Sequence, residues 1–426
     1  MGGFSHTDDT NTWVIRDRTY TLHTIVLPAS ESSPEASISC LLDPRYIPLL
    51  PNPPPQAHKP IENPCFELRN TPHKGIGLFA TRDVAAGDFV MTEHPALILS
   101  SGEFPPELYD AIGDRLPAKR RSELLAMANC RSPEECKSHV EGIVRTNGLL
   151  LELDPKGKLT GPKDFYGGVY PLINRSNHSC GPNVGLKWDL SSLTLTMYAL
   201  RAIRKGEEIH KTYLEPALPR EKRISHLQKN YRFTCDCPWC DIRGFVTTHA
   251  EEPESSSAVA DNERPFTDAE VQQIADSDER RYLLGHWVFT HLGYKKWSTD
   301  LARKDDMVIK SHLEALELIR IEGMEGLQNL FIEEIAMCYA MLGYLDAFRE
   351  WGEKVVTLSR IEDPPAAKRF EEWLVDPPKR VKKWGWRKTQ RDQQPGRRRL
   401  KAGQAVEEEP PIDALGLLFP SSDSDD

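Results

Sequence analysis

The sequence predicts an α+β fold, in which a β-rich region is followed by a helical region. Between residues 66 and 213, short β-type runs alternate with turns, for example at residues 193–198, where β-branched and apolar residues alternate. From residue 266 to residue 374, apolar residues instead recur at helical spacing. This change of period predicts two regions of different architecture.

Length and composition are those of a globular protein with more than one domain. The chain has 426 residues, of which 39% are hydrophobic and 28% are charged. It contains no run of about 18 apolar residues, and its first residues lack the basic and apolar segments of a secretory signal. We therefore expect no membrane contact. The net charge of −10 excludes a surface that is basic all over.

Changes of composition divide the chain into six expected segments. They are an N-terminal extension with one or two short strands and a proline-rich linker (1–60), the β-rich domain (61–215) with a helical insertion at about 106–146, a cysteine-rich segment (216–242), a linker (243–265), the helical domain (266–375) and a tail (376–426). Within the helical domain, the pattern predicts two antiparallel helices that turn at Gly343, similar to one tetratricopeptide hairpin.

The tail has two halves of opposite charge. Residues 379–401 are almost purely basic, and the last twenty residues are acidic. One interpretation is a solvated, disordered tail whose halves attract one another. The other is a nuclear import signal or a weak nucleic-acid contact through 379–401.

Three cysteines after the β-rich domain have the spacing of metal ligands. Cys235, Cys237 and Cys240 lie within six residues. Their thiolates can reach one tetrahedral Zn²⁺, but they fill only three of its four positions. A fourth ligand must therefore come from elsewhere in the chain. The alternative is a chance cluster of free thiols.

Three further runs contain residue types suited to ligand binding. The run 74–77 (KGIG) has two glycines, which let a backbone approach a ligand but are more often structural where a turn enters a strand. The run 174–183 (NRSNHSCGPN) is dense in hydrogen-bonding side chains, although a generic polar loop has a similar composition. The run 206–213 (GEEIHKTY) ends in Tyr213, which is either a core residue or a hydroxyl placed in a transfer channel.

In this order and at these separations, the four runs resemble the SET-domain family of lysine methyltransferases over residues 64–240. The insertion, the helical C-terminal region, Asn147, Tyr231 and Phe233 are most similar to the SET-and-MYND subgroup. The chain departs from that subgroup in three ways. It has no recognisable MYND zinc finger, Ser176 stands where a hydrophobic residue is usual, and Arg232 stands where a smaller residue is common.

The resemblance implies a β-clip SET fold with a helical insertion and a zinc-binding post-SET segment. The donor S-adenosylmethionine would be bound by Lys74, Gly75, Gly77, Asn147, Asn177, His178, Tyr213 and Phe233. A structural Zn²⁺ would be bound by Cys180, Cys235, Cys237 and Cys240. Tyr213 would be the catalytic residue, aligning the methyl group with the substrate amine.

We therefore expect an S-adenosylmethionine-dependent protein-lysine N-methyltransferase that acts on histone or non-histone proteins. The substrate lysine must arrive neutral, because an ammonium group has no lone pair with which to attack, and a dry channel favours the neutral form. The alternative is a catalytically silent SET scaffold that binds proteins through its helical region. We expect a monomer located in the nucleus, the cytoplasm or both.

Overall fold

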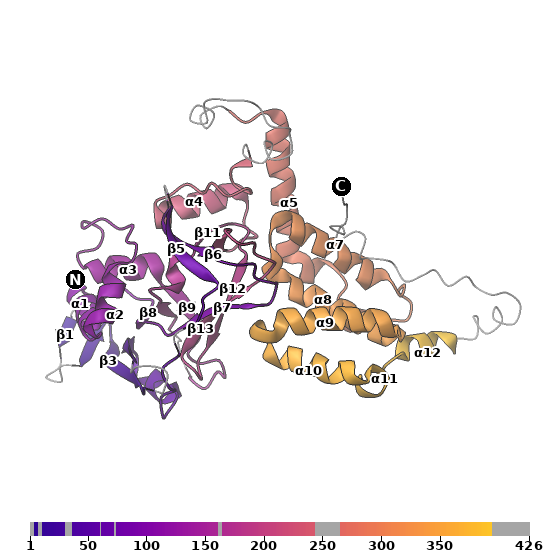
Figure 1. Ribbon diagram of the computed structural model, residues 1–426, viewed down its shortest axis with the longest axis horizontal. Coiled ribbons are helices and arrows are strands. Elements are labelled where there is room, and N and C mark those ends of the chain that lie inside the picture. Colours follow the sequence, from indigo (N-terminus) through magenta and orange to yellow (C-terminus); the bar gives the residue numbers. More distant parts are fainter. Residues whose placement is uncertain are drawn as a thin grey trace, which may run out of the picture. The chain divides into compact units, whose positions relative to one another are not determined.

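The computed structural model describes residues 4–6, 11–29, 36–59, 61–71, 74–160, 164–242 and 265–393. Its packing divides the chain into two units (Figure 1). The first, called the β unit below, comprises Met1–His178, Val184–Lys211 and His226–Thr234. The second, the helical unit, comprises Ser179–Asn183, Thr212–Ser225 and Cys235–Asp426. The chain thus passes from one unit to the other several times. The sequence instead predicts consecutive segments, with the β-rich domain ending at residue 215 and the helical domain beginning at residue 266.

The largest sheet of the β unit has seven strands in the order β1-β2-β3-β4-β8-β10-β9. Their bounds are β1 Phe4–His6, β2 Thr12–Ile15, β3 Arg18–Leu27, β4 Ala36–Leu42, β8 Leu97–Ser100, β9 Leu149–Leu151 and β10 Tyr166–Val169. β4 and β8 are parallel, and the other neighbours are antiparallel. The N-terminal extension contributes four strands, so the prediction of one or two is wrong. β4 is buried almost continuously and therefore lacks the period-2 pattern of a half-buried strand.

Two smaller sheets complete the β unit, one in the order β11-β14-β6-β5 and the other in the order β12-β13-β7. Their bounds are β5 Phe66–Thr71, β6 Gly75–Ala80, β7 Phe89–Glu93, β11 Asn177–His178, β12 Val184–Asp189, β13 Thr194–Ala199 and β14 Glu208–Lys211. The four-stranded sheet unites three of the runs singled out in the sequence, because β6, β11 and β14 each carry part of one.

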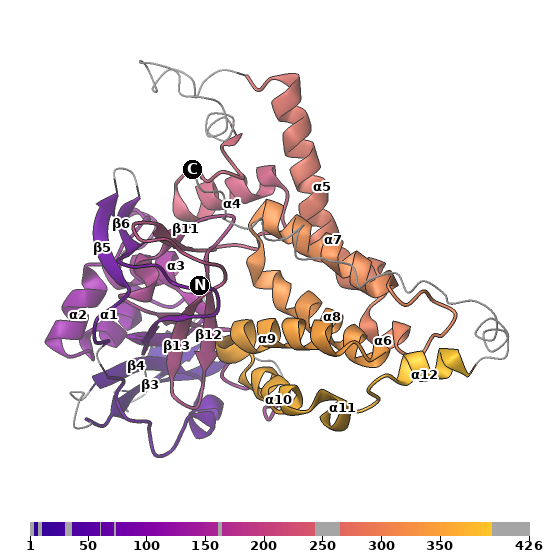
Figure 2. The ribbon, with the colours of Figure 1, turned by 45° about the vertical axis from the view of Figure 1, so that its right-hand side comes forward.

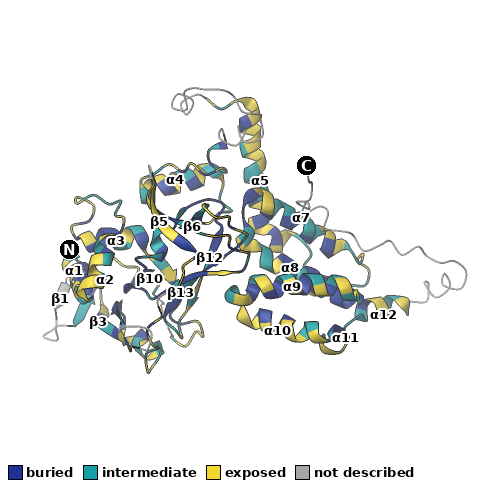
Figure 3. Cartoon of the chain, viewed as in Figure 1, coloured by how far each residue is buried: buried dark blue, intermediate teal, exposed yellow. Residues whose placement is uncertain are grey.

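The predicted helical insertion is present. It consists of α1 (Pro106–Asp114), α2 (Ala118–Leu125) and α3 (His139–Asn147). Leu108, Ile112 and Leu124 are buried, as their spacing predicts. They share one core cluster with Tyr20 and Leu22 of β3, so the insertion packs on the seven-stranded sheet (Figure 3).

The helical unit contains eight described helices after residue 265 (Figure 2). They are α5 Asp268–Thr290, α6 Tyr294–Trp297, α7 Met307–Glu322, α8 Gln328–Leu342, α9 Leu345–Glu362, α10 Pro364–Val375, α11 Pro377–Arg380 and α12 Trp386–Asp392. An earlier helix, α4 (Arg220–Tyr231), precedes the cysteine triplet, and short 3₁₀ helices lie at η1 Pro44–Leu49, η2 Ile173–Arg175 and η4 Glu325–Leu327. Gly343 ends α8 in the left-handed conformation (φ 74°), which confirms the predicted turn into α9.

The first part of the predicted tail is folded, because α11 and α12 extend the helical unit beyond residue 375. Arg387 is fully buried: its Nε donates to Asp305 at 2.8 Å, and its guanidinium lies 4.2 Å from the centre of the Trp297 ring. A basic run is usually solvated, but this arginine supports the core. Residues 394–426, including the acidic half of the tail, lie outside the described residues. No described helix is both long and apolar enough to cross a membrane.

Candidate functional site

The four-stranded sheet brings the glycine run, the polar run and the GEEI run side by side. β14 lies between β6 and β11, with Ile209 opposite Leu78 of β6 and His210 opposite Asn177 of β11. Pairing between these strands therefore places residues that are far apart in the sequence next to one another. The four-stranded sheet is called the donor sheet below, because it carries several of the residues expected to bind the donor.

The two glycines of β6 are required for different reasons. Gly75 has φ +71°, a conformation that L side chains rarely adopt, and no described atom lies within 4 Å of where its Cβ would be. A Cβ on Gly77 would lie 2.6 Å from Glu208 Oε1 and 3.0 Å from Asn177 Nδ2. Gly77 therefore leaves room for a contact between two side chains.

That contact joins Glu208 of β14 to Asn177 of β11. Asn177 Nδ2 donates to Glu208 Oε1 at 2.8 Å, and His210 Nε2 lies 3.2 Å from Glu208 Oε2. Burial by itself raises the pKa of Glu208, but hydrogen bonds from His210 and Asn177 and the charge of Lys74 hold it below its ordinary value. Glu208 is therefore an ionised carboxylate, and it fixes the Asn177 amide with its carbonyl oxygen directed away.

Asn147 is joined to the polar run through Asn174. The side-chain amide of Asn147 donates to the carbonyls of Ala128 and Ile143, both at 2.8 Å, and so closes the end of α3. Asn174 Nδ2 donates to the backbone carbonyl of Asn147 at 2.9 Å, and Asn174 Oδ1 accepts from the backbone N–H of Tyr170 at 2.8 Å. Asn174 thereby ties the end of α3 to the segment that leads into β11.

Phe233 also reaches the donor sheet. Its ring centre lies 6.2 Å from that of His178, which is buried in β11. Tyr213 follows β14 by two residues and belongs to the helical unit. Of the expected donor-binding residues, the β unit thus brings together Lys74, Gly75, Gly77, Asn147, Asn177, His178 and Phe233.

Two departures from the SET-and-MYND pattern have structural explanations. Ser176 is fully buried, and its hydroxyl donates to the carbonyl of Ile209 at 2.8 Å, so it links β14 to the start of β11. Arg232 adopts a left-handed conformation (φ 62°) directly after α4, and its exposed side chain pairs with Glu135. Ser176 therefore supports the local backbone, and Arg232 joins the end of α4 to the segment that contains Glu135.

The structure also brings Cys180 to the cysteine triplet. The sulfur atoms of Cys180, Cys235, Cys237 and Cys240 all lie within 4.8 Å of one another, and each residue is at most 6% exposed. Around one Zn²⁺ with Zn–S bonds of about 2.3 Å, tetrahedral geometry separates the sulfurs by about 3.8 Å. The four cysteines therefore fit a closed tetrahedral metal site. Four protein ligands leave no open position, which suits a structural metal.

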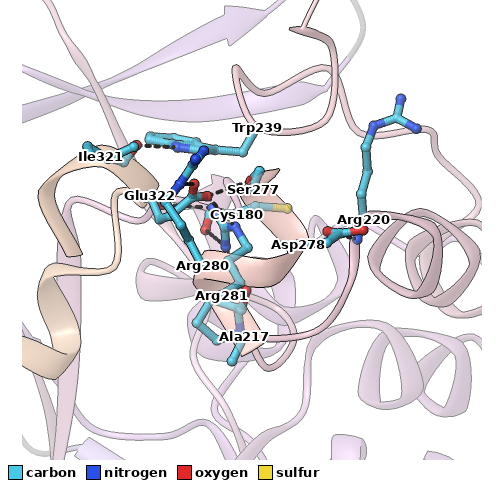
Figure 4. A network of polar contacts seen from close by, with 12 residues as sticks. Cys180, Ala217, Arg220, Trp239, Ser277, Asp278, Arg280, Arg281, Ile321 and Glu322 are labelled. Atoms are coloured by element: carbon cyan, nitrogen blue, oxygen red, sulfur yellow. Dashed lines mark hydrogen bonds and ion pairs between the residues drawn. The ribbon is translucent and has the colours of Figure 1, made fainter. Parts of the chain in front are cut away.

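Residues that no local sequence pattern reveals surround this cysteine cluster (Figure 4). Arg281 of α5 donates to the carbonyl of Cys180 at 3.2 Å and to Glu322 of α7 at 2.8 Å. The Trp239 indole donates to the carbonyl of Ile321 at 3.0 Å. A Cβ on Gly181 would lie 2.2 Å from this indole. The cluster is therefore packed and hydrogen-bonded directly to α5 and α7.

Comparison with known proteins agrees with this geometry. Residues 75–214 match the SET domain. The chain is 25% identical over 183 residues to the histone-lysine N-methyltransferase set5 of Schizosaccharomyces pombe, covering 43% of this chain and 52% of that protein. It is 35% identical over 108 residues to the protein-lysine N-trimethyltransferase SMYD5 of Gallus gallus, covering 24% and 26% of the two chains.

A third relative is the histone-lysine N-methyltransferase SMYD3 of Homo sapiens, 30% identical over 179 residues, or 40% of this chain and 36% of that protein. The matched segments span about half of the length of set5 and less than half of the length of the other two relatives. The SET match begins at Gly75 and ends one residue after Tyr213, so it includes the whole donor sheet except β5. Residues 75–214 are thus a SET domain, and the chain is a relative of the SET-domain lysine methyltransferases, close to the SET-and-MYND subgroup.

Proposed function

We propose that this protein is an S-adenosylmethionine-dependent protein-lysine N-methyltransferase. The observation that carries the proposal is the donor sheet, in which Gly75, Gly77, Asn177 and His178 meet within a SET domain. The relatives named above are lysine methyltransferases, which supports the same reaction class.

The donor supplies a methyl group activated by a cationic sulfonium. The side chains of the donor sheet suit a cationic ligand, because Glu208 is ionised and fixes the amide of Asn177. The proposed donor-binding residues are Lys74, Gly75, Gly77, Asn147, Asn177, His178, Tyr213 and Phe233. The aromatic ring of Phe233, close to His178, would cover the adenine.

Tyr213 is the proposed catalytic residue. Its hydroxyl would orient the neutral amine of the substrate lysine for in-line attack, and orientation of this kind contributes several kcal/mol to lowering a barrier. We propose a structural Zn²⁺ held by Cys180, Cys235, Cys237 and Cys240, which keeps the segment after α4 folded.

The proposed substrate is a lysine in a histone or another protein, and the proposed location is the nucleus, the cytoplasm or both. We also propose a monomer, with weak nucleic-acid contact through 379–401. Within that run, Arg387 and Arg391 bind Asp305. The exposed basic residues of the run, among them Lys379, Lys382 and Lys388, would therefore have to carry such a contact.

Incubation of the purified chain with radiolabelled S-adenosylmethionine and histones or cell lysate tests the function. We expect label to enter protein with the parent and with the control Tyr344→Phe, and to be lost with Tyr213→Phe. Undiminished transfer by Tyr213→Phe would remove Tyr213 from the mechanism. Absence of donor binding by calorimetry would overturn the proposal and favour a silent SET scaffold.

A further inference from the structure

Part of the basic run 379–401 is folded onto the helical unit through a contact between two glycines. Gly385, which directly precedes α12, has φ 62°, and its N–H donates to the carbonyl of Ala340 in α8 at 2.8 Å. A Cβ on Gly343, at the turn between α8 and α9, would lie 3.3 Å from the Cα of Gly385. The basic run is therefore held against this turn, and α12 lies at one edge of the helical unit (Figure 2).

The fold itself uses three of the seven basic side chains between residues 376 and 393. Arg387 and Arg391 bind Asp305, and Lys379 pairs with Asp376. The other four are exposed, and none of them forms an ion pair in the part of the chain that the structure describes. They are Arg380, Lys382, Lys383 and Lys388.

The excess of positive charge is confined to this segment. Residues 376–393 contain seven basic residues and two acidic ones, Asp376 and Asp392. Residues 298–310, which bind Arg387, contain three of each, and residues 328–375, which include α8 to α10, contain five basic and nine acidic residues. Because salt and these neighbouring carboxylates limit long-range attraction, an anion must be bound by direct contact with the four exposed cations.

An aromatic ring lies among these cations. Trp386 is the first residue of α12 and is only partly buried. The ammonium group of Lys383 lies 5.6 Å from the centre of its ring. Proteins bind single-stranded nucleic acid with cations beside an aromatic ring, because the cations contact phosphates and a base stacks on the ring. An acidic peptide would use the cations alone, and a duplex would offer no uncovered base.

We infer that Trp386 and the four exposed cations, together called the basic–aromatic patch, bind a short stretch of single-stranded nucleic acid. The inference rests on the proposed nucleic-acid contact through 379–401 and assigns it to folded residues of that run. It is independent of methyl transfer.

Fluorescence anisotropy of the full chain with a short labelled oligothymidylate, measured over a range of salt concentrations, tests the role of the cations. We expect Lys383→Gln combined with Lys388→Gln to weaken binding and to reduce the slope of log affinity against log salt by about 1.4, or about 0.7 for each lost phosphate contact. Lys222→Gln combined with Lys229→Gln, which removes two exposed lysines of α4, is the control and should leave the slope unchanged.

Trp386→Leu tests the role of the ring. We expect it to weaken binding of the single strand about 5- to 100-fold, as for loss of one stacked base, and to change binding of the duplex with oligoadenylate much less. Trp386→Phe retains a ring and should retain most of the affinity. Equal affinity of the parent for single strand and duplex, or equally effective competition by polyglutamate, would overturn the inference.

Arg397→Gln, Arg398→Gln and Arg399→Gln together separate the two proposals, because these residues of the basic run lie outside the described residues. Loss of binding in this triple variant but not in the Lys383 and Lys388 variant would overturn the patch and keep the proposed contact through 379–401. No binding of either probe by the parent would overturn both.

Discussion

The donor sheet and the cysteine cluster are both assembled from distant segments, but they handle buried charge differently. In the donor sheet, burial lowers the pKa of Lys211 to about 7, so this lysine can become neutral. Around the cluster, Arg223 and Arg281 are fully buried and keep their charge. Lys211 of the donor sheet can therefore respond to burial by losing its proton, whereas the cysteine cluster depends on complete pairing of the charges around it. Substitutions should accordingly be far more costly around the cluster.

The largest effect is expected for Glu322→Gln. Glu322 accepts hydrogen bonds from Ser277, Arg280 and Arg281. Neutralising it leaves the fully buried Arg281 without its carboxylate, which should lower the free energy of unfolding by about 3–5 kcal/mol. Denaturant unfolding measures this change.

Glu317→Gln is the matched control, because its partner Arg320 is on the surface. Its expected cost is below about 1 kcal/mol. Similar small costs for both variants would contradict the claim that charges around the cluster must be fully paired.

A smaller effect of opposite sign is expected for Lys211→Met. Because the folded-state pKa of Lys211 is about 7 and its unfolded value is 10.5, folding releases a proton between these pH values. The parent should lose stability as pH falls through this window. The Met variant should therefore be more stable at pH 7 by about 1–4 kcal/mol, and the advantage should disappear near pH 10.5.

Unfolding of both proteins across this pH range measures the difference, with the exposed Lys205→Met as control. An advantage that does not change with pH would show that Lys211 remains protonated in the folded protein.

A more local effect is expected for Glu208→Gln. The neutral amide no longer fixes the Asn177 amide in one orientation and no longer attracts a cationic donor. Loss of a hydrogen bond to a charged group should weaken donor affinity about 10- to 100-fold. Calorimetry with S-adenosylmethionine measures it, with Glu207→Gln, which pairs with Arg201, as control. Equal affinity in both variants would exclude this role for Glu208.

The features that the sequence predicts correctly are those set by residues close together in the chain. They include the helical insertion, the turn at Gly343 and the spacing of the three cysteines. Cys180 and Asn177 are predicted by the resemblance to a known family. The sequence does not predict the role of Glu208, because its partner Asn177 is on another strand and 31 residues away. Arg281 and Glu322 are 41 residues apart and are joined only by tertiary packing. The basic composition of residues 379–401 predicts a solvated segment, and the sequence therefore does not reveal α12, which is held by the buried Arg387.

Titration of the full chain with S-adenosylmethionine tests the donor sheet most directly. We predict one donor bound per chain, and loss of binding in Gly77→Ala, because the new Cβ would displace the Glu208–Asn177 contact. Gly167→Ala is the control, since its Cβ would meet its nearest neighbour at an ordinary 3.8 Å. No binding by the parent, or equal binding by Gly77→Ala, would contradict the account.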